Sequence, residues 1–561
     1  MKISAAKFKW LLVILIFIAA VALAVYLFSR GGMYQIREEL KTIIPVFLEI
    51  NFLLLLIGLL INLGIFRKLF GRLEKNQIVL LLVVVLIAML CSALIPPRTH
   101  RIYYDEDIYL HIAQNLNFER KAQMCNYGTN EYGEFKCFRG EYNKEPYGYP
   151  YIISLVFRLF GDKELAAHVL NNLLYGLSVL VLFCIVFLLF EQFLPALYSA
   201  IVFLLIPQNL VWSNTAAAEP AASFFTGLAL LIFFLYLKEK KPVLLFWAFA
   251  VLAFSVQFRP ESILILFLVF AALLLLTGIS EFRKSTLYGM GGMLALLIVP
   301  HLFHIYSVQG ENWGASGAKF AMNYVAFNLK TNGLYYLNNR EFPLLFALLA
   351  LLGLGVAKDW RRKVIVGLWF LLFWGIFVVF YAGSYQYGAD VRFSLVSYMP
   401  LAIFAGLGLG WIHQKLGGRP IGIQLIPLLI VLFVFSSFLP MIRATREEAW
   451  APRADHMYAQ KFARMLPENS LILTHNPNIF FLLGKNAAQA SLISTDPAFV
   501  EEIFNRFRGG VYFHYNFWCN VDDPVQTQFC QNVLNMFETR LVAEYSERNY
   551  RFALYKLVNK K

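Results

Sequence analysis

The sequence predicts an all-α polytopic membrane protein that carries a small α/β domain at its C-terminal end. Of its 561 residues, 59% are hydrophobic and only 15% are charged, whereas soluble domains are about 45–50% apolar and about 25% charged. The apolar residues are gathered in runs, many of which approach the roughly 20 residues that span a bilayer as a helix. Because backbone polar groups in hydrocarbon must be bonded within the segment, these runs predict transmembrane helices.

About thirteen spans are expected on this basis. They cover residues 10–28, 43–65, 77–95, 165–190, 195–211, 215–237, 242–257, 260–278, 286–306, 343–357, 364–381, 394–412 and 421–440. The first run begins like a signal peptide, but no small-residue cleavage site is obvious, so we expect a retained helix. The runs at 195–211 and 242–257 are short, and re-entrant segments are the alternative there.

Basic residues in the short loops set the predicted orientation. The loops expected in the cytoplasm contain Arg67, Lys68, Arg72, Lys75, Lys238, Lys240, Lys241, Arg283, Lys284, Lys358, Arg361, Arg362, Lys363, Lys415 and Arg419. Apart from residues 29–42, the opposite short loops carry far fewer. The positive-inside rule then places the N-terminus in the cytoplasm of a plasma (inner) membrane protein. It also explains the net charge of +14 without a nucleic-acid partner, since no separate basic domain is present.

Three larger polar segments fall outside the membrane in this topology: residues 96–150, 307–342 and 441–561. The expected domains are the N-terminal transmembrane helices (1–95), a first extracytoplasmic loop (96–150), a transmembrane core (151–440) and an extracytoplasmic α/β domain (441–561). In the last of these, strands are expected at 471–474, 511–517 and in both halves of 540–557, and helices at 497–508 and 524–538.

The extracytoplasmic cysteines occur in two pairs. Cys125 and Cys137 share the first loop, and Cys519 and Cys530 share the C-terminal domain. Even pairs outside the membrane suit an oxidising compartment and predict two disulfides; four free thiols are the alternative.

Three consecutive acids, Asp105, Glu106 and Asp107, open a helical pattern in the first loop. Helical spacing puts Asp105 on the same face as Ile108 and Ile112, so it could cap the helix and point toward the membrane surface. A partly desolvated carboxylate suits a general base. An ordinary acidic helix start, favoured by the helix dipole, explains the acids equally well.

Cations and one acid near the outer ends of the runs are candidates for binding an anionic lipid. Lys144 precedes the return to the membrane, and Arg259 and Arg392 lie in short outer loops; each can hold a phosphate. Snorkelling of Lys144, and pairing of the arginines with Glu261 and Asp390, are the alternatives. Glu219 lies near the end of a span, where a charge is costly and therefore a functional candidate; snorkelling to the membrane surface is the alternative.

A divalent metal between Glu145 and His168 is the cofactor considered. Two ligands are too few for a definite metal site. His475 and His514 have no ligand-like spacing and are interpreted as structural. The sequence offers no phosphate loop, dinucleotide fingerprint or nucleophile elbow in a suitable context, so nucleotide-driven transport and serine hydrolysis lack support.

The order of motifs resembles a known family. "YYDEDIYLHIAQNL", "NKEPYGYPYIISLVFRLFG", "SNTAAAEPAASFF", "FRPESILIL" and "DVRFSLVSYMPL" follow one another over residues 85–440. This order is similar to that of the GT-C fold glycosyltransferases, in particular relatives of protein O-mannosyltransferases and of the lipid A aminoarabinose transferase (glycosyltransferase family 39-like). Two spans precede the usual first one, and Asp107 makes the register of the acidic pair ambiguous.

The resemblance implies a hexosyl- or pentosyltransferase that takes a sugar from a polyprenyl-phosphate carrier (undecaprenyl or dolichyl type) at the outer face. It implies Asp105 as base, Glu106 as its partner, Lys144 near the phosphate and Arg392 at a late span; Tyr109 is a further substrate-binding candidate. The acceptor is a lipid, a glycan or a protein. A transporter or flippase of lipid-linked glycans is the main alternative, although the paired broken helices typical of it are not apparent, and a scaffold is the third.

If one cavity serves the reaction, Asp105, Lys144 and Arg392 should line it. The base must lie near the cations without a tight ion pair, because a carboxylate in a salt bridge is a weaker base.

Overall fold

Two compact units make up the chain, and each contains segments from distant parts of the sequence. The structure, a computed structural model, describes residues 5–131, 133–311, 315, 317–338, 342–386, 388–416, 432, 433, 436 and 438–560. Unit 1 comprises residues 1–98 and 168–448, and unit 2 comprises residues 99–167 and 449–561.

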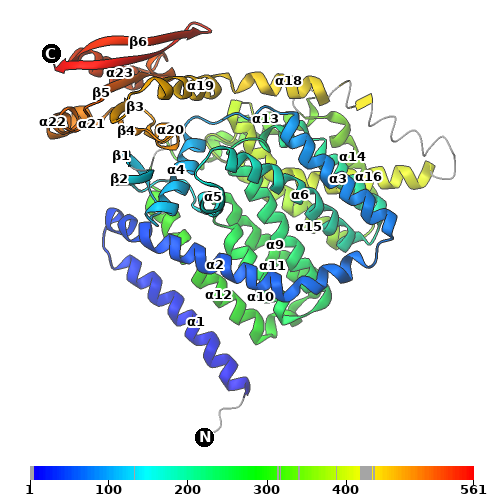
Figure 1. The fold of residues 1–561 in the computed structure, drawn as a ribbon. Coiled ribbons are helices and arrows are strands. Elements are labelled where there is room, and N and C mark those ends of the chain that lie inside the picture. The colour runs from blue at the N-terminus through cyan, green and yellow to red at the C-terminus, as the bar shows by residue number, and fades with distance from the viewer. Residues whose placement is uncertain are drawn as a thin grey trace. The chain divides into compact units, whose positions relative to one another are not determined.

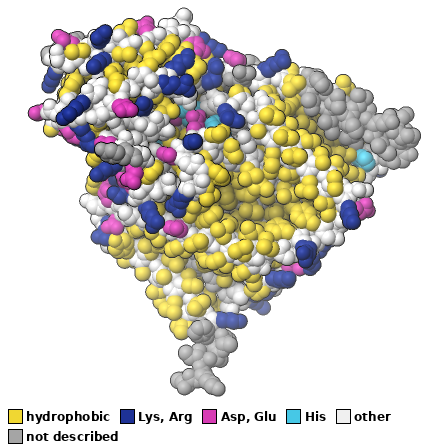
Figure 2. Space-filling view, viewed as in Figure 1, with side chains coloured by type: hydrophobic (Ala, Val, Ile, Leu, Met, Phe, Trp, Pro, Cys, Tyr) yellow, Lys and Arg dark blue, Asp and Glu magenta, His cyan; other side chains and the backbone are white. Residues whose placement is uncertain are grey.

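Unit 1 is helical (Figure 1). Its described α-helices are α1 (Ala5–Phe28), α2 (Met33–Phe70), α3 (Lys75–Leu94), α6 (Leu165–Phe190), α7 (Phe193–Leu204), α8 (Pro207–Trp212), α9 (Glu219–Glu239), α10 (Pro242–Ser255), α11 (Ile265–Thr277), α12 (Ser285–Val308), α13 (Val325–Leu337), α14 (Leu344–Val356), α15 (Trp360–Val378), α16 (Tyr398–Leu416) and α18 (Leu439–Glu448). The 3-10 turns are η1 (Pro260–Leu264), η2 (Ile279–Arg283), η3 (Met322–Tyr324) and η4 (Gly388–Ser397). Eight apolar segments among the described residues are long enough to cross a bilayer, and α7, α10 and α14 are shorter apolar helices. Hydrophobic side chains cover unit 1 broadly on the face seen in Figure 2.

Most predicted spans coincide with these helices, and the differences have local causes. The run at 195–211 is two helices, since Pro207 lacks an N–H and begins a new helix. The span expected at 43–65 lies within the longer α2, whose first turns are polar. The span expected at 421–440 lies largely outside the described residues, so the count of thirteen stays a prediction.

Ion pairs join the basic loops at one end of unit 1. Lys68 pairs with Glu239 at 2.6 Å, and Lys240 with Glu281 at 3.2 Å. Lys238 pairs with Glu191, and Arg362 donates to the Leu189 carbonyl. The loops around Lys68, Lys240, Glu281 and Arg362, which are predicted to share one side of the membrane, therefore lie at one end of unit 1.

The segment 29–42, which departs from the predicted charge pattern, has its cations paired. Arg30 pairs with Glu39 at 2.9 Å, and Lys41 pairs with Glu38 at 2.6 Å. Arg37 donates to the Ser307 carbonyl at 2.6 Å and pairs with Glu311. The segment therefore lies beside the start of residues 307–342, the segment predicted to be outside.

Glycines let α16 pack closely against two neighbours at once. A Cβ on Gly408 of α16 would lie 2.3 Å from the Leu349 carbonyl oxygen of α14, and one on Gly353 of α14 would lie 1.7 Å from the Phe404 carbonyl oxygen. On the opposite face of α16, a Cβ on Gly406 would lie 2.1 Å from Ser199 Oγ of α7. Small residues of this kind permit close helix contact in membranes.

Unit 2 is an α/β structure built around a seven-stranded sheet with the order β2-β1-β4-β3-β5-β7-β6 (Figure 1). Its strands are β1 (Met124–Glu131), β2 (Glu134–Glu141), β3 (Ser470–Thr474), β4 (Asn486–Gln489), β5 (Gly510–Tyr515), β6 (Phe537–Glu547) and β7 (Tyr550–Lys560). Its helices are α4 (Asp105–Phe118), α5 (Gly148–Phe160), α19 (Trp450–Met465), α20 (Pro477–Leu482), α21 (Leu492–Thr495), α22 (Pro497–Arg506), η6 (Phe517–Cys519) and α23 (Pro524–Met536).

The sheet draws its strands from both halves of unit 2. β1, from the first outer loop, pairs antiparallel with β4 of the C-terminal segment, with Gly128 opposite Ala487. Alternate residues of β3 point to two cores: Leu471 and Leu473 to one, and Ile472 to the other. The predicted strands and helices of the C-terminal domain are confirmed, and β1, β2 and β4 are additional.

Both predicted disulfides are confirmed. Cys125 and Cys137 are bonded with a Cα–Cα distance of 5.8 Å, and Cys519 and Cys530 with 5.7 Å. The first bond joins β1 to β2 within unit 2, and the second joins η6 to α23.

Candidate functional site

The three acids at the start of α4 have three different environments. Successive helical side chains point about 100° apart, so they cannot share one surface. Asp105 is partly exposed, whereas Glu106 and Asp107 are buried. Glu106 Oε1 accepts the backbone N–H groups of Arg101 at 2.6 Å and Ile102 at 3.0 Å, which fixes the turn that leads into α4.

Asp105 is the first residue of α4 and does not cap it, so the capping part of the prediction is wrong. The N-cap position belongs to Tyr104, which makes no side-chain cap hydrogen bond and has a φ of 61°. A non-glycine residue in the left-handed region carries backbone strain, and such strain is often found at functional sites. The turn 101–104, held by Glu106, therefore sets the position of Asp105.

Asp107 belongs to a cluster of two histidines and two carboxylates. Its Oδ1 lies 3.2 Å from His100 Nδ1 and 3.5 Å from His456 Nδ1, and its Oδ2 accepts from Asn476 at 2.9 Å. The Nε2 atoms of the same two rings face Glu164, at 3.1 Å from His100 and 2.9 Å from His456. We refer to His100, Asp107, Glu164 and His456 as the histidine cluster.

Charges within the histidine cluster change the acid strength of Asp107. Burial alone would raise the pKa of this carboxyl, but the neighbouring His100 and His456 outweigh burial and lower the pKa to about 2. Burial would likewise lower the pKa of His100, yet the carboxylates of Asp107, Glu106 and Glu164 raise it well above its usual value. A carboxylate with so low a pKa is a weak base.

Tyr109, Lys144 and Glu145 lie around one turn of unit 2. The Tyr109 hydroxyl donates to Glu145 Oε2 at 3.0 Å, and the Glu145 backbone N–H donates to Asn143 Oδ1 at 2.8 Å. The turn that carries Lys144 is thereby attached to α4, the helix that Asp105 begins.

In unit 1, two arginines from different segments meet at one buried carboxylate. Glu219, at the first residue of α9, is 1% exposed. Arg259 Nη1 pairs with Glu219 Oε1, and Arg392 Nε lies 3.0 Å from the same oxygen. The ring of Phe393 lies under both guanidinium groups, 5.4 Å from Arg259 Cζ and 4.8 Å from Arg392 Cζ. We refer to Glu219, Arg259, Arg392 and Phe393 as the arginine cluster.

Two further carboxylates approach the arginine cluster. Glu261 pairs with Arg259, and Asp390 Oδ1 lies 3.6 Å from Arg392 Nη1. The local pairing considered from the sequence is therefore present, together with the contact through Glu219. Buried charges of this kind need partners, and an anion bound here would have to compete with the carboxylates.

The arginine cluster and the basic loops lie at opposite ends of unit 1. Glu219 begins α9 and Glu239, the partner of Lys68, ends it. A helix of 21 residues is about 30 Å long at 1.5 Å per residue, close to the thickness of a hydrocarbon core.

The predicted site residues thus fall into two groups. Asp105, Glu106, Asp107, Tyr109, Lys144 and Glu145 belong to unit 2, and His168, Glu219, Arg259 and Arg392 belong to unit 1. His168 Nδ1 lies 2.9 Å from the Asn214 carbonyl oxygen. The cavity predicted for Asp105, Lys144 and Arg392, and the metal predicted between Glu145 and His168, stay predictions.

Sequence reasoning missed the histidine cluster apart from Asp107. His100 precedes α4, Glu164 lies in the turn before α6, and His456 is on α19. These residues share no short-range spacing. The one local signal is Gln460, one helical turn after His456, whose Nε2 lies 3.0 Å from His456 Nε2.

Comparisons with known proteins give a family match for part of the chain. Residues 144–304 match the family model described as dolichyl-phosphate-mannose-protein mannosyltransferase. No curated protein sequence matches the chain.

Solved structures share the fold over most of the chain. ArnT from Cupriavidus metallidurans bound to undecaprenyl phosphate gives a TM-score of 0.53 at 12% identity, covering 87% of this chain and 99% of that one. The oligosaccharyltransferase AglB from Archaeoglobus fulgidus, in complex with an inhibitory peptide and a dolichol-phosphate, gives 0.51 at 11% identity, covering 86% and 74%. The predicted fold class and the predicted resemblance are both confirmed: the chain is a multi-pass membrane protein with the GT-C fold.

Proposed function

We propose that this chain, which has the GT-C glycosyltransferase fold and a protein mannosyltransferase match over residues 144–304, moves a sugar from a polyprenyl-phosphate donor to an acceptor hydroxyl. The observation that carries the proposal is the arginine cluster, in which two guanidinium groups from separate loops converge at the end of α9. Undecaprenyl phosphate in the ArnT structure and dolichol-phosphate in the AglB structure support the donor class.

The chemistry needs a cation for the leaving phosphate and a base for the acceptor. Arg259 and Arg392 are the proposed phosphate ligands, since guanidinium groups form paired, charge-assisted hydrogen bonds to phosphate oxygens. Glu219 holds both arginines in place before the donor arrives. The loops at the Glu239 end of α9 are basic, so the positive-inside rule supports an outer location for the arginine cluster.

Asp105 is the proposed general base. Of the three adjacent acids, Glu106 is committed to two backbone N–H groups and Asp107 to the histidine cluster. Asp105 is the partly exposed member at the start of α4, and we assign the contact with the acceptor hydroxyl to it. Lys144, from the adjoining turn, and Tyr109, on α4 itself, are proposed to contact the substrate. Direct displacement of the phosphate by the deprotonated hydroxyl inverts the anomeric carbon and needs no nucleotide.

Two variants separate binding from chemistry. Native mass spectrometry of the full chain in nanodiscs measures undecaprenyl phosphate binding. Loss of one charge-assisted hydrogen bond costs about 1.5–3 kcal/mol, so Arg392→Gln should bind the lipid about 10- to 100-fold more weakly. Arg361→Gln, at the basic end of unit 1, should bind it normally. Equal binding by Arg392→Gln and Arg361→Gln would refute the phosphate assignment.

The base is tested by turnover. Donors that carry different hexoses and pentoses on undecaprenyl phosphate are offered with lipid, glycan and peptide acceptors, and sugar-free undecaprenyl phosphate is measured. Asp105→Asn should lose about 10²–10⁴ in rate and keep lipid binding. Near-normal release by this variant would refute the assignment of Asp105, and no release by the unaltered chain with any donor would refute the transferase.

A further inference from the structure

We propose that the histidine cluster of unit 2 binds one divalent first-row transition-metal ion, with Zn²⁺ as the preferred occupant. The proposed ligands are Nε2 of His100, Nε2 of His456 and the carboxylate of Glu164. The proposal concerns unit 2 alone and does not depend on the transferase activity.

The distances fit a metal centre. Ligand atoms bonded at 2.0–2.1 Å around a tetrahedral ion lie about 3.3 Å apart. The Glu164 oxygens lie 3.1 Å from His100 Nε2 and 2.9 Å from His456 Nε2, and one ligand atom from each of the three residues lies within 4.8 Å of the others. The three side chains come from three separate segments, yet they converge.

Asp107 lies on the opposite side of both rings and acts as a positioning residue. Its carboxylate faces Nδ1 of His100 and of His456, so it holds a proton on each Nδ1, and a bound ion would replace the proton on each Nε2. Metal-binding histidines almost always have such a partner for the second ring nitrogen. Asn476 donates to Asp107 and fixes it in turn.

The donor set selects the class of ion. Imidazole nitrogens suit Zn²⁺ and its first-row neighbours, whereas Mg²⁺ and Ca²⁺ prefer oxygen ligands throughout. The Gln460 side-chain amide lies beside two of the proposed ligands: its Nε2 is 3.5 Å from Glu164 Oε2 and 3.0 Å from His456 Nε2. Rotation of this amide by 180° would present its oxygen as a fourth ligand, because the two orientations are nearly indistinguishable in shape.

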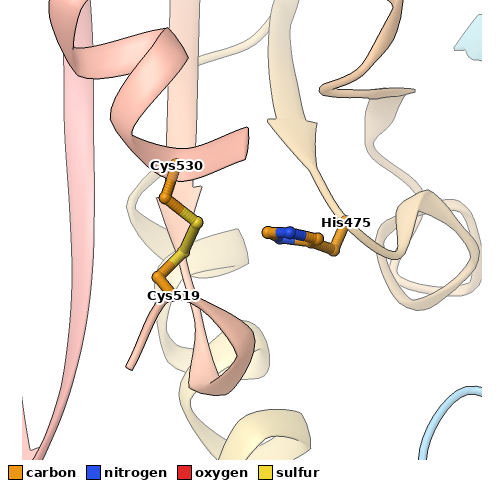
Figure 3. Close-up of side chains that lie close together, drawn as sticks. All are labelled: His475, Cys519 and Cys530. Atoms are coloured by element: carbon orange, nitrogen blue, oxygen red, sulfur yellow. A yellow bond between two sulfur atoms is a disulfide. The ribbon is translucent and has the colours of Figure 1, made fainter. Parts of the chain in front are cut away.

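A second grouping of histidine and cysteine in unit 2 does not meet these conditions. The His475 ring points toward Cys519 and Cys530, but the two sulfurs are bonded to each other at 2.05 Å (Figure 3). The thiolate is the metal-binding form of cysteine, and a disulfide has none. His475 is therefore a matched control, since it is a histidine of the same unit whose grouping offers no thiolate ligand.

The rival to the proposal is an ion-pair network of the same four side chains without a metal. To distinguish them, the full chain in detergent is stripped with a chelator, dialysed against Zn²⁺ or Co²⁺, and its metal content is measured by mass spectrometry. We expect about one ion per chain, with visible Co²⁺ absorption of tetrahedral intensity.

Three variants grade the response. His456→Gln should lose the bound ion and the Co²⁺ absorption. Asp107→Asn, which keeps the shape of the side chain, should bind Zn²⁺ about 10- to 100-fold more weakly, as is typical when a partner of a metal-binding histidine is removed. His475→Gln should bind like the unaltered chain. Absence of stoichiometric metal in the unaltered chain, or unchanged binding by both His456→Gln and Asp107→Asn, would establish the metal-free network instead.

Discussion

A methyl group added to Gly353 should separate α14 from α16. The new Cβ would lie 1.7 Å from the Phe404 carbonyl oxygen, whereas non-bonded carbon and oxygen atoms need about 3.0 Å or more. The backbones must therefore move apart locally by about 1.3 Å, because neither atom belongs to a flexible side chain. Overpacking of this kind costs about 1–3 kcal/mol.

Gly355 of the same helix supplies the control, since a Cβ there meets nothing within 4 Å. Both Gly→Ala changes gain the same helix propensity, up to about 1 kcal/mol, so the difference between them isolates the clash. We expect Gly353→Ala to be less stable than Gly355→Ala by about 1–3 kcal/mol.

The assay is thermal unfolding of the purified full chain in detergent, followed by intrinsic fluorescence. Gly353→Ala should unfold several degrees below Gly355→Ala. A second variant, Gly408→Ala, meets the Leu349 carbonyl of α14 and should behave similarly. The double variant should lose less than the two losses added together, because one separation of the helices relieves both clashes. Equal midpoints for Gly353→Ala and Gly355→Ala, or strict additivity, would refute the close contact.

Three further predictions concern unit 2 and the topology. Cys125→Ser should destabilise unit 2 by about 3 kcal/mol, as the loss of a disulfide that closes a short loop implies. Backbone hydrogen exchange in β1 should then be faster in this variant than in the unaltered chain, and equal exchange rates would contradict the prediction. Burial lowers the pKa of His111 and of His514 to about 3, against about 6.5 when unfolded, so their stabilising contribution is complete above pH 6.5. The free energy of unfolding should fall by about 1.4 kcal/mol per histidine and pH unit as the pH decreases toward 3. The denaturation midpoint should therefore decrease with pH, and it should decrease less steeply in His514→Asn; a pH-independent midpoint would contradict the buried neutral state. An impermeant thiol reagent should label a cysteine placed at Asn505 from outside and spare one at Lys240, and the reverse pattern would overturn the orientation.

The membrane part of the fold was predictable because each transmembrane helix is identified by the hydropathy of its own residues, without knowledge of its neighbours. The run at 165–190 is α6 with the same bounds. The first turns of α2 were not predicted, because they are polar and a search for apolar runs does not detect them. β1 and β2 were missed since their residues, from Met124 to Glu141, show no clean alternation of polar and apolar side chains.

The candidate site was predictable residue by residue but not as an arrangement. Glu219, Arg259 and Arg392 each stood out as a charge beside a membrane span, yet their convergence on one carboxylate depends on helix packing. The role of Asp107 depends on His456, from the far end of the chain. The three adjacent acids look alike in the sequence, and only the folded structure shows that Glu106 binds backbone N–H groups and that Asp107 binds histidines.

The mixed origin of the sheet has a consequence for biogenesis. β1 pairs with β2 on one edge and with β4, from the C-terminal segment, on the other. The ribosome therefore synthesises β1 and β2 long before β4. Until residues 449–561 have been synthesised, the edge of β1 that pairs with β4 has no partner strand, whereas the β1–β2 pairing and the Cys125–Cys137 disulfide can already form. Pairing over so great a sequence separation is slow, and exposed strand edges are prone to misassembly. A chain arrested before α19 should therefore leave Asp107 without His456 and Asn476, and β1 without its pairing to β4.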